Sequence, residues 1–382
     1  MKRRAVLCWA GSAVLPPLAW PLNAAAIATE RSPIRLGQSA PITGPLARVG
    51  TAFRDTARAV FAEATAAGGV AGRAIELVTL DDEDRPERTA VNVKLLASEY
   101  NVVGLFGFVG AGAHRAGARG AADEGLPYIA AVSGSQELRS GALPWIFNLR
   151  AGHLDEIEYI VRHTQQVGIT RVSLVSEYNS QGWELRDALI TSFEARGSQV
   201  ASISSIDHEG SRYSLPGAVS SVLAGAPQAI VLGADYVASA RFVTAVREAG
   251  FTGLFYTLST VGGEAMTEQL GPRAVGLSVT QVVPFPWTAS LPVGRSFQSF
   301  CTRHKLEPSF ASMEAWLAAN LLVDALRRAR DATPAGLVDA LQALPPRDFG
   351  GYVAAFYSSA RSRRTPPQVD LTVFSRAGKF IK

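Results

Sequence analysis

The sequence predicts an α/β protein with two successive lobes, each a doubly wound parallel sheet. From Ile34 onward one unit recurs, in which a short apolar or β-branched run is followed by a loop and by a longer stretch of helical periodicity. This series restarts after Asn148-Leu149-Arg150, and the residues after Pro292 are mostly helical. Strands that alternate with helices form parallel sheets through right-handed crossovers, so two series of units predict two sheets.

The first series has recognisable start and stop signals. Phe53, Ala57 and Val60 share one face of the first helix, which Gly68-Gly69 ends. Pro86 opens the next helix at its first turn, where a missing N–H costs nothing. We expect strands at 34–38, 75–80, 102–106 and 128–132, and helices at 51–66, at 86–100 and up to residue 123.

The second series repeats the same alternation, and the last section departs from it. We expect helices at 153–167, 183–196, 214–224 and 236–249 and strands at 171–175, 200–206, 229–233 and 254–258. The last section supplies helices within 292–330 and at 334–343 and one strand at 371–374. Because a single strand cannot form its own sheet, this section must complete the earlier lobes.

Composition and charge exclude several classes of protein. The 382 residues are 47% apolar and 18% charged, which suits two or three globular domains. The formal charge of +4 includes Lys2-Arg3-Arg4, and without these three residues 34 basic residues face 33 acidic ones. A nearly neutral body lacks the basic excess that binds nucleic acid, so we expect no nucleic-acid partner.

The N-terminal residues have the three parts of a secretory signal. Lys2-Arg3-Arg4 precedes an apolar stretch at 5–22, and Ala24-Ala25-Ala26 offers small residues for cleavage. We expect residues 1–28 to be a cleaved signal peptide that exports the protein to the periplasm. Cys8 leaves with that segment, so Cys301 alone remains and no intramolecular disulfide is possible.

Two loops follow strands of the first series and carry small residues. Gly110-Ala111-Gly112 half-matches a dinucleotide fingerprint, but its sixth position is Arg115 and the acidic residue expected further on is missing. Backbone N–H groups at such a turn can bind an anion or a carbonyl oxygen, although a tight turn without ligand remains open. Ser133-Gly134-Ser135 follows the next strand, where open α/β sheets bind ligands. No G-x-S-x-G motif accompanies these serines, so we expect no enzyme.

No residue pattern indicates a metal or a cofactor. Asp81-Asp82-Glu83-Asp84 lacks the alternation of a calcium loop and fits the acidic first turn of a helix. The five histidines show no zinc-ligand spacing. The phosphate-binding G-x-x-x-x-G-K-[ST] loop is also missing from the sequence.

Several short motifs, in this order, resemble one family. Motifs at 37–46 (GQSAPITGPL), 67–72 (AGGVAG) and 80–86 are similar to the opening of the extracellular solute-binding proteins of ABC importers. The resemblance is to the leucine/isoleucine/valine-binding type, and it continues through 127–129, 146–150 and 247–251.

The resemblance implies the type I periplasmic-binding fold, with two lobes, three hinge crossovers and a ligand cleft between the lobes. It places the crossovers near 148–151, 280–284 and 351–356. Lobe 1 would comprise residues 29–149 plus 281–352, and lobe 2 residues 150–280 plus 353–382.

The resemblance also implies the ligand-binding residues. In lobe 1 they would be the loops 110–112 and 133–135, which correspond to the loops that hold the ligand's carboxylate in relatives. The serine hydroxyl that relatives carry in the first of these loops is missing here. In lobe 2, Gln181 replaces an aromatic residue, Ser259 stands where relatives carry the acid that pairs with an ammonium, and Asp235 is the sole carboxylate nearby. The full set is Gly110, Ala111, Gly112, Ser133, Gly134, Ser135, Gln181, Asp235, Tyr236 and Ser259. Asp84 and Gly110 occupy the positions of the relatives' lobe 1 disulfide, and these departures argue against leucine-type specificity.

These expectations combine into one function. The protein would be a monomeric solute-binding component that closes over an amino acid, amide or carboxylate and delivers it to ABC permease subunits in the inner membrane. A ligand-sensing receptor of the same fold that signals to a membrane partner is the alternative.

Overall fold

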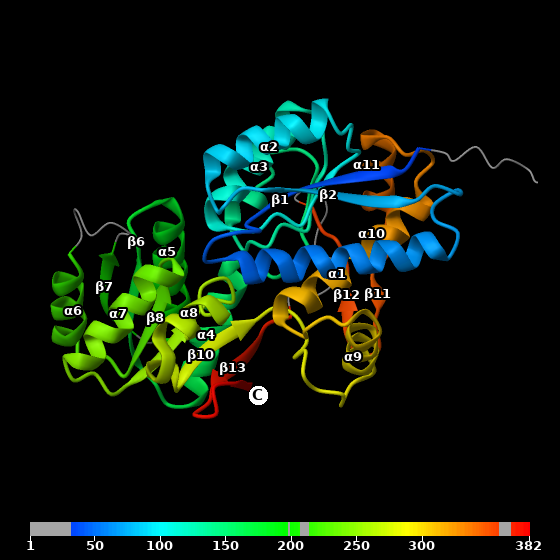
Figure 1. The fold of residues 1–382 in the computed structure, drawn as a ribbon. Coiled ribbons are helices and arrows are strands. Elements are labelled where there is room, and N and C mark those ends of the chain that lie inside the picture. The colour runs from blue at the N-terminus through cyan, green and yellow to red at the C-terminus, as the bar shows by residue number, and fades with distance from the viewer. Residues whose placement is uncertain (1–31, 198, 207–213, 359–367) are drawn as a thin grey trace, which may run out of the picture. The chain divides into compact units, whose positions relative to one another are not determined.

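The computed structural model describes residues 32–197, 199–206, 214–358 and 368–382 (Figure 1). The expected signal peptide lies outside the described residues. Among those residues, no helix has the length and apolar character needed to cross a membrane.

The first sheet has five parallel strands in the order β2-β1-β3-β4-β5. Its strands are β1 (Ile34–Ala40), β2 (Ile75–Asp81), β3 (Leu105–Phe106), β4 (Tyr128–Ile129) and β5 (Ile146–Phe147). Its helices are α1 (Ala47–Ala66), α2 (Pro86–Ser98) and α3 (Ala111–Asp123). The apolar face expected for the first helix is buried, since Phe53 and Ala57 are fully enclosed.

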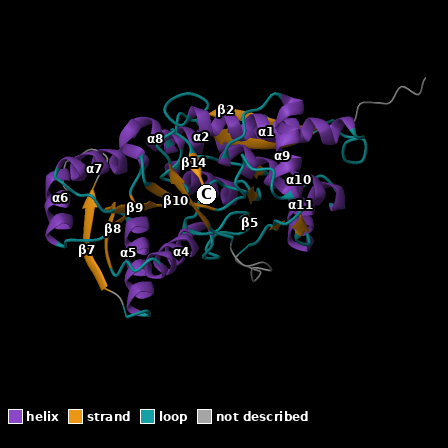
Figure 2. Ribbon diagram, turned by 90° about the horizontal axis from the view of Figure 1, so that it is seen from below, coloured by secondary structure: helices purple, strands orange, loops and turns teal. Residues whose placement is uncertain are grey.

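The second sheet has seven strands in the order β14-β13-β10-β9-β8-β6-β7. Its strands are β6 (Arg171–Glu177), β7 (Gln199–Ile206), β8 (Ala229–Gly233), β9 (Leu254–Thr257), β10 (Leu277–Gln281), β13 (Asp370–Phe374) and β14 (Phe380–Ile381). Its helices are α4 (His153–Gln166), α5 (Ser180–Glu194), α6 (Leu215–Ala224), α7 (Tyr236–Glu248) and α8 (Glu264–Leu270). Figure 2 shows α7 and α8 on one side of its strands and α4 and α5 on the other.

The edge of the second sheet is antiparallel, which the alternating pattern did not predict. β13 pairs antiparallel with β10, and β14 pairs antiparallel with β13. These strands enter the sheet after the chain returns from the first lobe, so no βαβ crossover dictates their direction.

The late helical section packs on the first sheet. It contains α9 (Pro292–His304), α10 (Phe310–Arg328) and α11 (Pro334–Ala343), followed by the short strands β11 (Arg347–Asp348) and β12 (Val353–Ala354). α10 lies along α1, and Leu317 and Leu321 share one hydrophobic core with Phe53 and Val60. The second sheet has a separate core of its own.

Three segments connect the two lobes. The first follows β5, the second follows β10, and the third lies between β12 and β13. Asn148 of the first and Tyr357 of the third exchange backbone hydrogen bonds of 2.8 and 2.9 Å. The hydroxyl of Tyr352, the residue before β12, donates to the Val282 carbonyl of the second at 3.0 Å. These bonds hold the connections side by side, as a hinge requires.

Candidate ligand-binding site

Loops at the carboxyl ends of strands from both sheets meet in the structure. Arg48, in the first turn of α1, forms an ion pair of 3.0 Å with Glu264 at the start of α8. The backbone N–H of Gln136, after β4, donates to the carboxylate of Glu184 on α5. Residues far apart in the sequence are thereby brought to one place between the sheets, which is where open α/β folds bind ligands.

The loop 110–112 fits closely against the start of α2. Gly110 has a φ of 110°, which side-chain-bearing residues rarely adopt, and a Cβ there would lie 2.2 Å from Asp84 Oδ1. A Cβ on Gly112 would lie 2.3 Å from Pro86 Cγ. Gly110 therefore faces the acidic loop after β2, whereas Gly112 lets α3 pack on α2. Ala111 begins α3.

The serines of the next loop bond to their own turn. Ser133 Oγ accepts from the Ser135 N–H at 3.1 Å, and Ser135 Oγ accepts from the Glu137 N–H at 3.3 Å. Gly134 packs against His153, because a Cβ there would lie 2.1 Å from the imidazole Cδ2. The loop is thus fixed to the start of α4, and each of its two hydroxyls accepts one backbone hydrogen bond from its own turn.

Two carboxylates of the second lobe lie together. Asp235 Oδ1 caps α7 by accepting the N–H groups of Val237 at 2.7 Å and Ala238 at 3.0 Å. The Asp235 N–H donates to Glu177 Oε1 at 3.3 Å. Burial, and then the neighbouring Asp235, raise the pKa of Glu177 to about 7. Gln181 lies in the first turn of α5, next to this group, and is half-buried.

Asp84 faces this pair from the first lobe. Burial, followed by the charges of Asp82 and Asp235, raises the pKa of Asp84 to about 6. Burial and then Asp84 and Asp235 raise the pKa of Tyr236 as well. The expectation that Asp235 is the sole carboxylate here is therefore wrong, because Asp84 and Glu177 accompany it. Glu177 is the last residue of β6, and Asp84 lies in the loop after β2, so both stand at the carboxyl ends of strands.

A second group of polar residues surrounds Ser259. Arg150 Nη2 donates to Ser259 Oγ at 2.7 Å, and Arg150 Nε lies 3.7 Å from Glu314 Oε1. The Ser259 N–H donates to Glu156 Oε2 at 2.8 Å. His153 Nε2 lies 3.2 Å from Thr260 Oγ1, so the loop 133–135 adjoins this group.

The sequence analysis did not assign Arg150, Glu156 or Glu314 to the site. A signal existed for Glu314, which is the one charged residue between residues 310 and 323 and is 4% exposed. Its partner Arg150 is separated from it by most of the second lobe, so only the three-dimensional structure pairs them.

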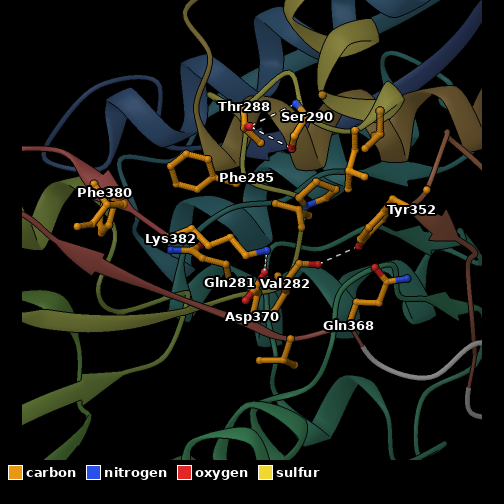
Figure 3. Close-up of a pocket in the computed structure, with 18 residues that line it drawn as sticks. Gln281, Val282, Phe285, Thr288, Ser290, Tyr352, Gln368, Asp370, Phe380 and Lys382 are labelled. Carbon is orange, nitrogen blue, oxygen red and sulfur yellow. Dashed lines mark hydrogen bonds and ion pairs between the residues drawn. The ribbon is translucent and has the colours of Figure 1, made fainter. Parts of the chain in front are cut away.

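Two cavities lie near the connections between the lobes. The smaller, of about 80 Å³, is lined by Arg150, Ser259 and Glu314 with apolar walls that include Val132 and Phe310. The larger, of about 800 Å³, lies between the second and third connections and the C-terminal strands, and Figure 3 shows Phe285, Tyr352 and Lys382 around it. No residue predicted to bind ligand lines the larger cavity.

Within the described ranges, no cluster of three or more histidine, cysteine or acidic side chains is arranged to hold a metal ion. Asp84, Asp235 and Glu177 instead stand at the carboxyl ends of three strands in two lobes.

Comparison with known proteins assigns the family. A periplasmic binding protein family matches residues 33–368, a range that includes strands of both sheets and the late helices. The chain belongs to the periplasmic binding protein family. A search of curated protein sequences found no match.

Solved structures of this family share the fold. A possible leucine/isoleucine/valine-binding protein from Rhodopirellula baltica aligns with a TM-score of 0.82 and 22% identity, covering 94% of this chain and 98% of that one. A substrate-binding periplasmic protein from Ralstonia solanacearum gives 0.78 and 28%, covering 91% and 99%. A leucine-binding protein from Thermotoga maritima gives 0.77 and 18%, covering 91% and 98%. The type I periplasmic-binding fold expected from the sequence is confirmed.

Proposed function

We propose that this periplasmic binding protein is the solute-binding component of an ABC importer and captures a small organic molecule between its lobes. The observation that carries the proposal is the family match across both lobes, together with the loops that meet between them. One structural relative is described as a putative branched-chain amino acid ABC transporter protein from Rhodospirillum rubrum. As a binding protein it would catalyse no reaction, and its partners would be permease subunits in the inner membrane.

The proposed mechanism is closure on a hinge. A ligand that touches both lobes stabilises the closed arrangement by the difference between its affinities for the closed and open forms. The hydrogen bonds between Asn148 and Tyr357 keep the connections together while the lobes move. Residues 1–28 would direct export to the periplasm and then be removed.

The ligand would lie between two polar groups. Gly110, Asp84, Asp235 and Tyr236 form one side, with carboxylates that suit a donor-rich part of the ligand. The other side is the group around Ser259, where a guanidinium is available. Such a site favours a solute with distinct polar ends over a purely apolar one.

A thermal-shift screen of purified residues 29–382 tests the proposal. Amino acids, amides and short carboxylates would be added at millimolar concentration, and any hit would be titrated by calorimetry. A ligand present at 100 times its Kd stabilises a protein by about 2.7 kcal/mol, which is easily seen as a shift in Tm.

The location of binding needs a matched pair of variants. Gly110→Val should abolish the response, because its side chain would meet Asp84, whereas Arg119→Leu on the exposed face of α3 should preserve it. Failure of every solute class to shift Tm, or equal responses from the two variants, would count against the proposed function.

A further inference from the structure

Three charged side chains are buried where the first connection, α4 and α10 come together. Arg150 and Glu314 are each 4% exposed, and Glu156 is 0% exposed. Burying a charged group costs free energy unless each of its polar atoms forms a hydrogen bond or an ion pair.

Part of the group is satisfied. Glu156 Oε2 accepts from the Ser259 N–H and from the Thr280 hydroxyl, and Arg150 Nη2 donates to Ser259 Oγ. Arg150 Nε and Nη1, Glu314 Oε1 and Glu156 Oε1 have no hydrogen-bond partner among the described residues, and of these three side chains Arg150 and Glu314 line the small cavity. Arg150 Nε and Glu314 Oε1 face each other at 3.7 Å, which is longer than a hydrogen bond.

The unpartnered atoms of Arg150 and Glu314 belong to side chains that line the small cavity. Its volume is about 80 Å³, enough for the end of a small molecule, and Val132, Val282 and Phe310 contribute apolar wall. The cavity therefore presents a buried donor beside a buried acceptor, in a lining that also includes polar residues such as Arg48, Glu264 and Gln281. Buried polar groups in proteins are almost always hydrogen-bonded, so the cavity is built for a guest that accepts from Arg150 and donates to Glu314.

We infer that this cavity holds a neutral carboxamide end of the solute, whose carbonyl accepts from Arg150 while its N–H₂ donates to Glu314. The inference rests on the proposed function and names the chemical class that the same site selects. An amide carries an acceptor and two donors on one planar group and adds no net charge to the enclosure.

The charged alternatives fit less well. A carboxylate would be attracted to Arg150 but would bring a like charge against Glu314, which would keep an unpartnered oxygen. An ammonium would pair with Glu314 but would meet the guanidinium of Arg150. Either guest leaves one buried partner unsatisfied, and an unmade buried hydrogen bond is more costly than a made one is favourable.

Three probes of matched size test this selection. Propanamide, propanoate and propylammonium would be titrated into residues 29–382 at one pH and one ionic strength, with binding followed by thermal shift and by calorimetry. We expect propanamide to bind at least about tenfold more tightly than either charged probe, the ratio that corresponds to 1.4 kcal/mol. Equal or tighter binding of propanoate or of propylammonium would overturn the inference, and so would binding of none of the three, since the cavity would then hold only water.

Two isosteric variants test whether the direct contact with Glu314, and not the overall negative potential near the cavity, sets the preference. Glu314→Gln removes the charge beside Arg150, so propanoate should then bind better than propanamide. Glu307→Gln removes a charge of the same sign from an exposed carboxylate that does not line the cavity, and propanamide should remain preferred. If Glu307→Gln changes the ratio as much as Glu314→Gln, the donor–acceptor pair is not the cause and the inference fails.

A conservative variant and the wider screen complete the test. Glu314→Asp keeps the acceptor and should retain the preference for propanamide with weaker binding, which holds even if Glu314→Gln folds poorly. If the screen finds a solute that binds but propanamide does not, this inference fails while the proposed function stands. If no solute binds, the proposed function fails with it.

Discussion

At the scale of single residues, the carboxylate of Asp235 interacts both with the start of α7 and with a second carboxylate, Glu177. It accepts hydrogen bonds from the first N–H groups of α7, and it lies beside Glu177 in a half-buried site. Asparagine caps helices about as well as aspartate, whereas alanine does not. We expect Asp235→Asn to change the free energy of unfolding by less than about 0.5 kcal/mol and Asp235→Ala to lower it by about 0.5–2 kcal/mol. Urea unfolding measures both, and equal losses would show that the cap is not what Asp235 contributes.

Glu177 makes stability depend on pH. Its pKa is raised to about 7, mainly by burial, against about 4.3 for an unfolded chain. Between these values the folded protein holds a proton that the unfolded chain lacks, so this contribution is complete below about pH 4 and is lost as the pH rises through about 7. We expect Glu177→Gln to raise Tm at pH 8 and to flatten the dependence of Tm on pH between 5 and 8.

The control for this pH effect is Asp123→Asn, the same change of charge at an exposed position on α3. It should leave the pH dependence of Tm as it is in the parent protein. Tm would be measured against pH by differential scanning calorimetry. If the curves for the parent protein and for Glu177→Gln are parallel, Glu177 does not bind the proton.

At the scale of elements, the packing of α3 on α2 depends on one glycine. A Cβ on Gly112 would lie 2.3 Å from Pro86 Cγ, so a larger side chain must push the two helices apart. We expect Gly112→Leu to lower the free energy of unfolding by about 1–3 kcal/mol, as overpacking does. Arg119→Leu places the same side chain on the exposed face of α3 and should cost less than about 0.5 kcal/mol. Chemical unfolding measures the free energy of unfolding of both variants. A Gly112→Leu protein as stable as Arg119→Leu would show that the packing of α3 on α2 does not depend on Gly112.

The long elements could be predicted from the sequence because periodicity and capping residues define them. α1, α4 and α7 begin or end within a few residues of their expected positions. β3 begins at Leu105, later than expected, whereas β4 is shorter than expected because the backbone turns soon after it. Ala130 ends β4 with a φ of 53°, a conformation that alanine seldom adopts and that its sequence does not signal. The antiparallel β13 depends on the return of the chain from the other lobe, which no local pattern encodes.

The candidate site, like the fold, could be predicted from the sequence only in part. The loops 110–112 and 133–135 could be placed because they follow strands whose carboxyl ends meet in one crevice. The roles of their residues could not, since the hydroxyls of Ser133 and Ser135 turn out to bond within their own loop. Arg150 and Glu314 lie on segments far apart in the sequence, so no local pattern pairs them.

At the scale of the whole molecule, like charges from the two lobes oppose each other across the site. Asp84 belongs to the loop after β2, Asp235 belongs to the loop after β8, and Glu177 is the last residue of β6. Burial comes first among the causes that raise the pKa values of Asp84 and Glu177, and the Asp235 charge adds to both. When the lobes separate, the burial of Asp84 and its proximity to Asp235 should both decrease, so the open form should release the proton that Asp84 holds in the closed form.

Protonation should therefore favour closure of the ligand-free protein. As the pH falls from 8 to 5, we expect the population of the closed form to rise, because Asp84 becomes neutral where the lobes meet. Asp84→Asn should raise that population at pH 8 and weaken its response to pH. Spin labels at Glu87→Cys on α2 and Arg241→Cys on α7 would report the distance between the lobes, since both positions are exposed. Cys301 is buried and its thiol pKa is raised to about 11, so it should escape labelling in the folded protein. Distance distributions that do not change with pH, or that change equally in the parent and in Asp84→Asn, would show that these carboxylates do not oppose closure.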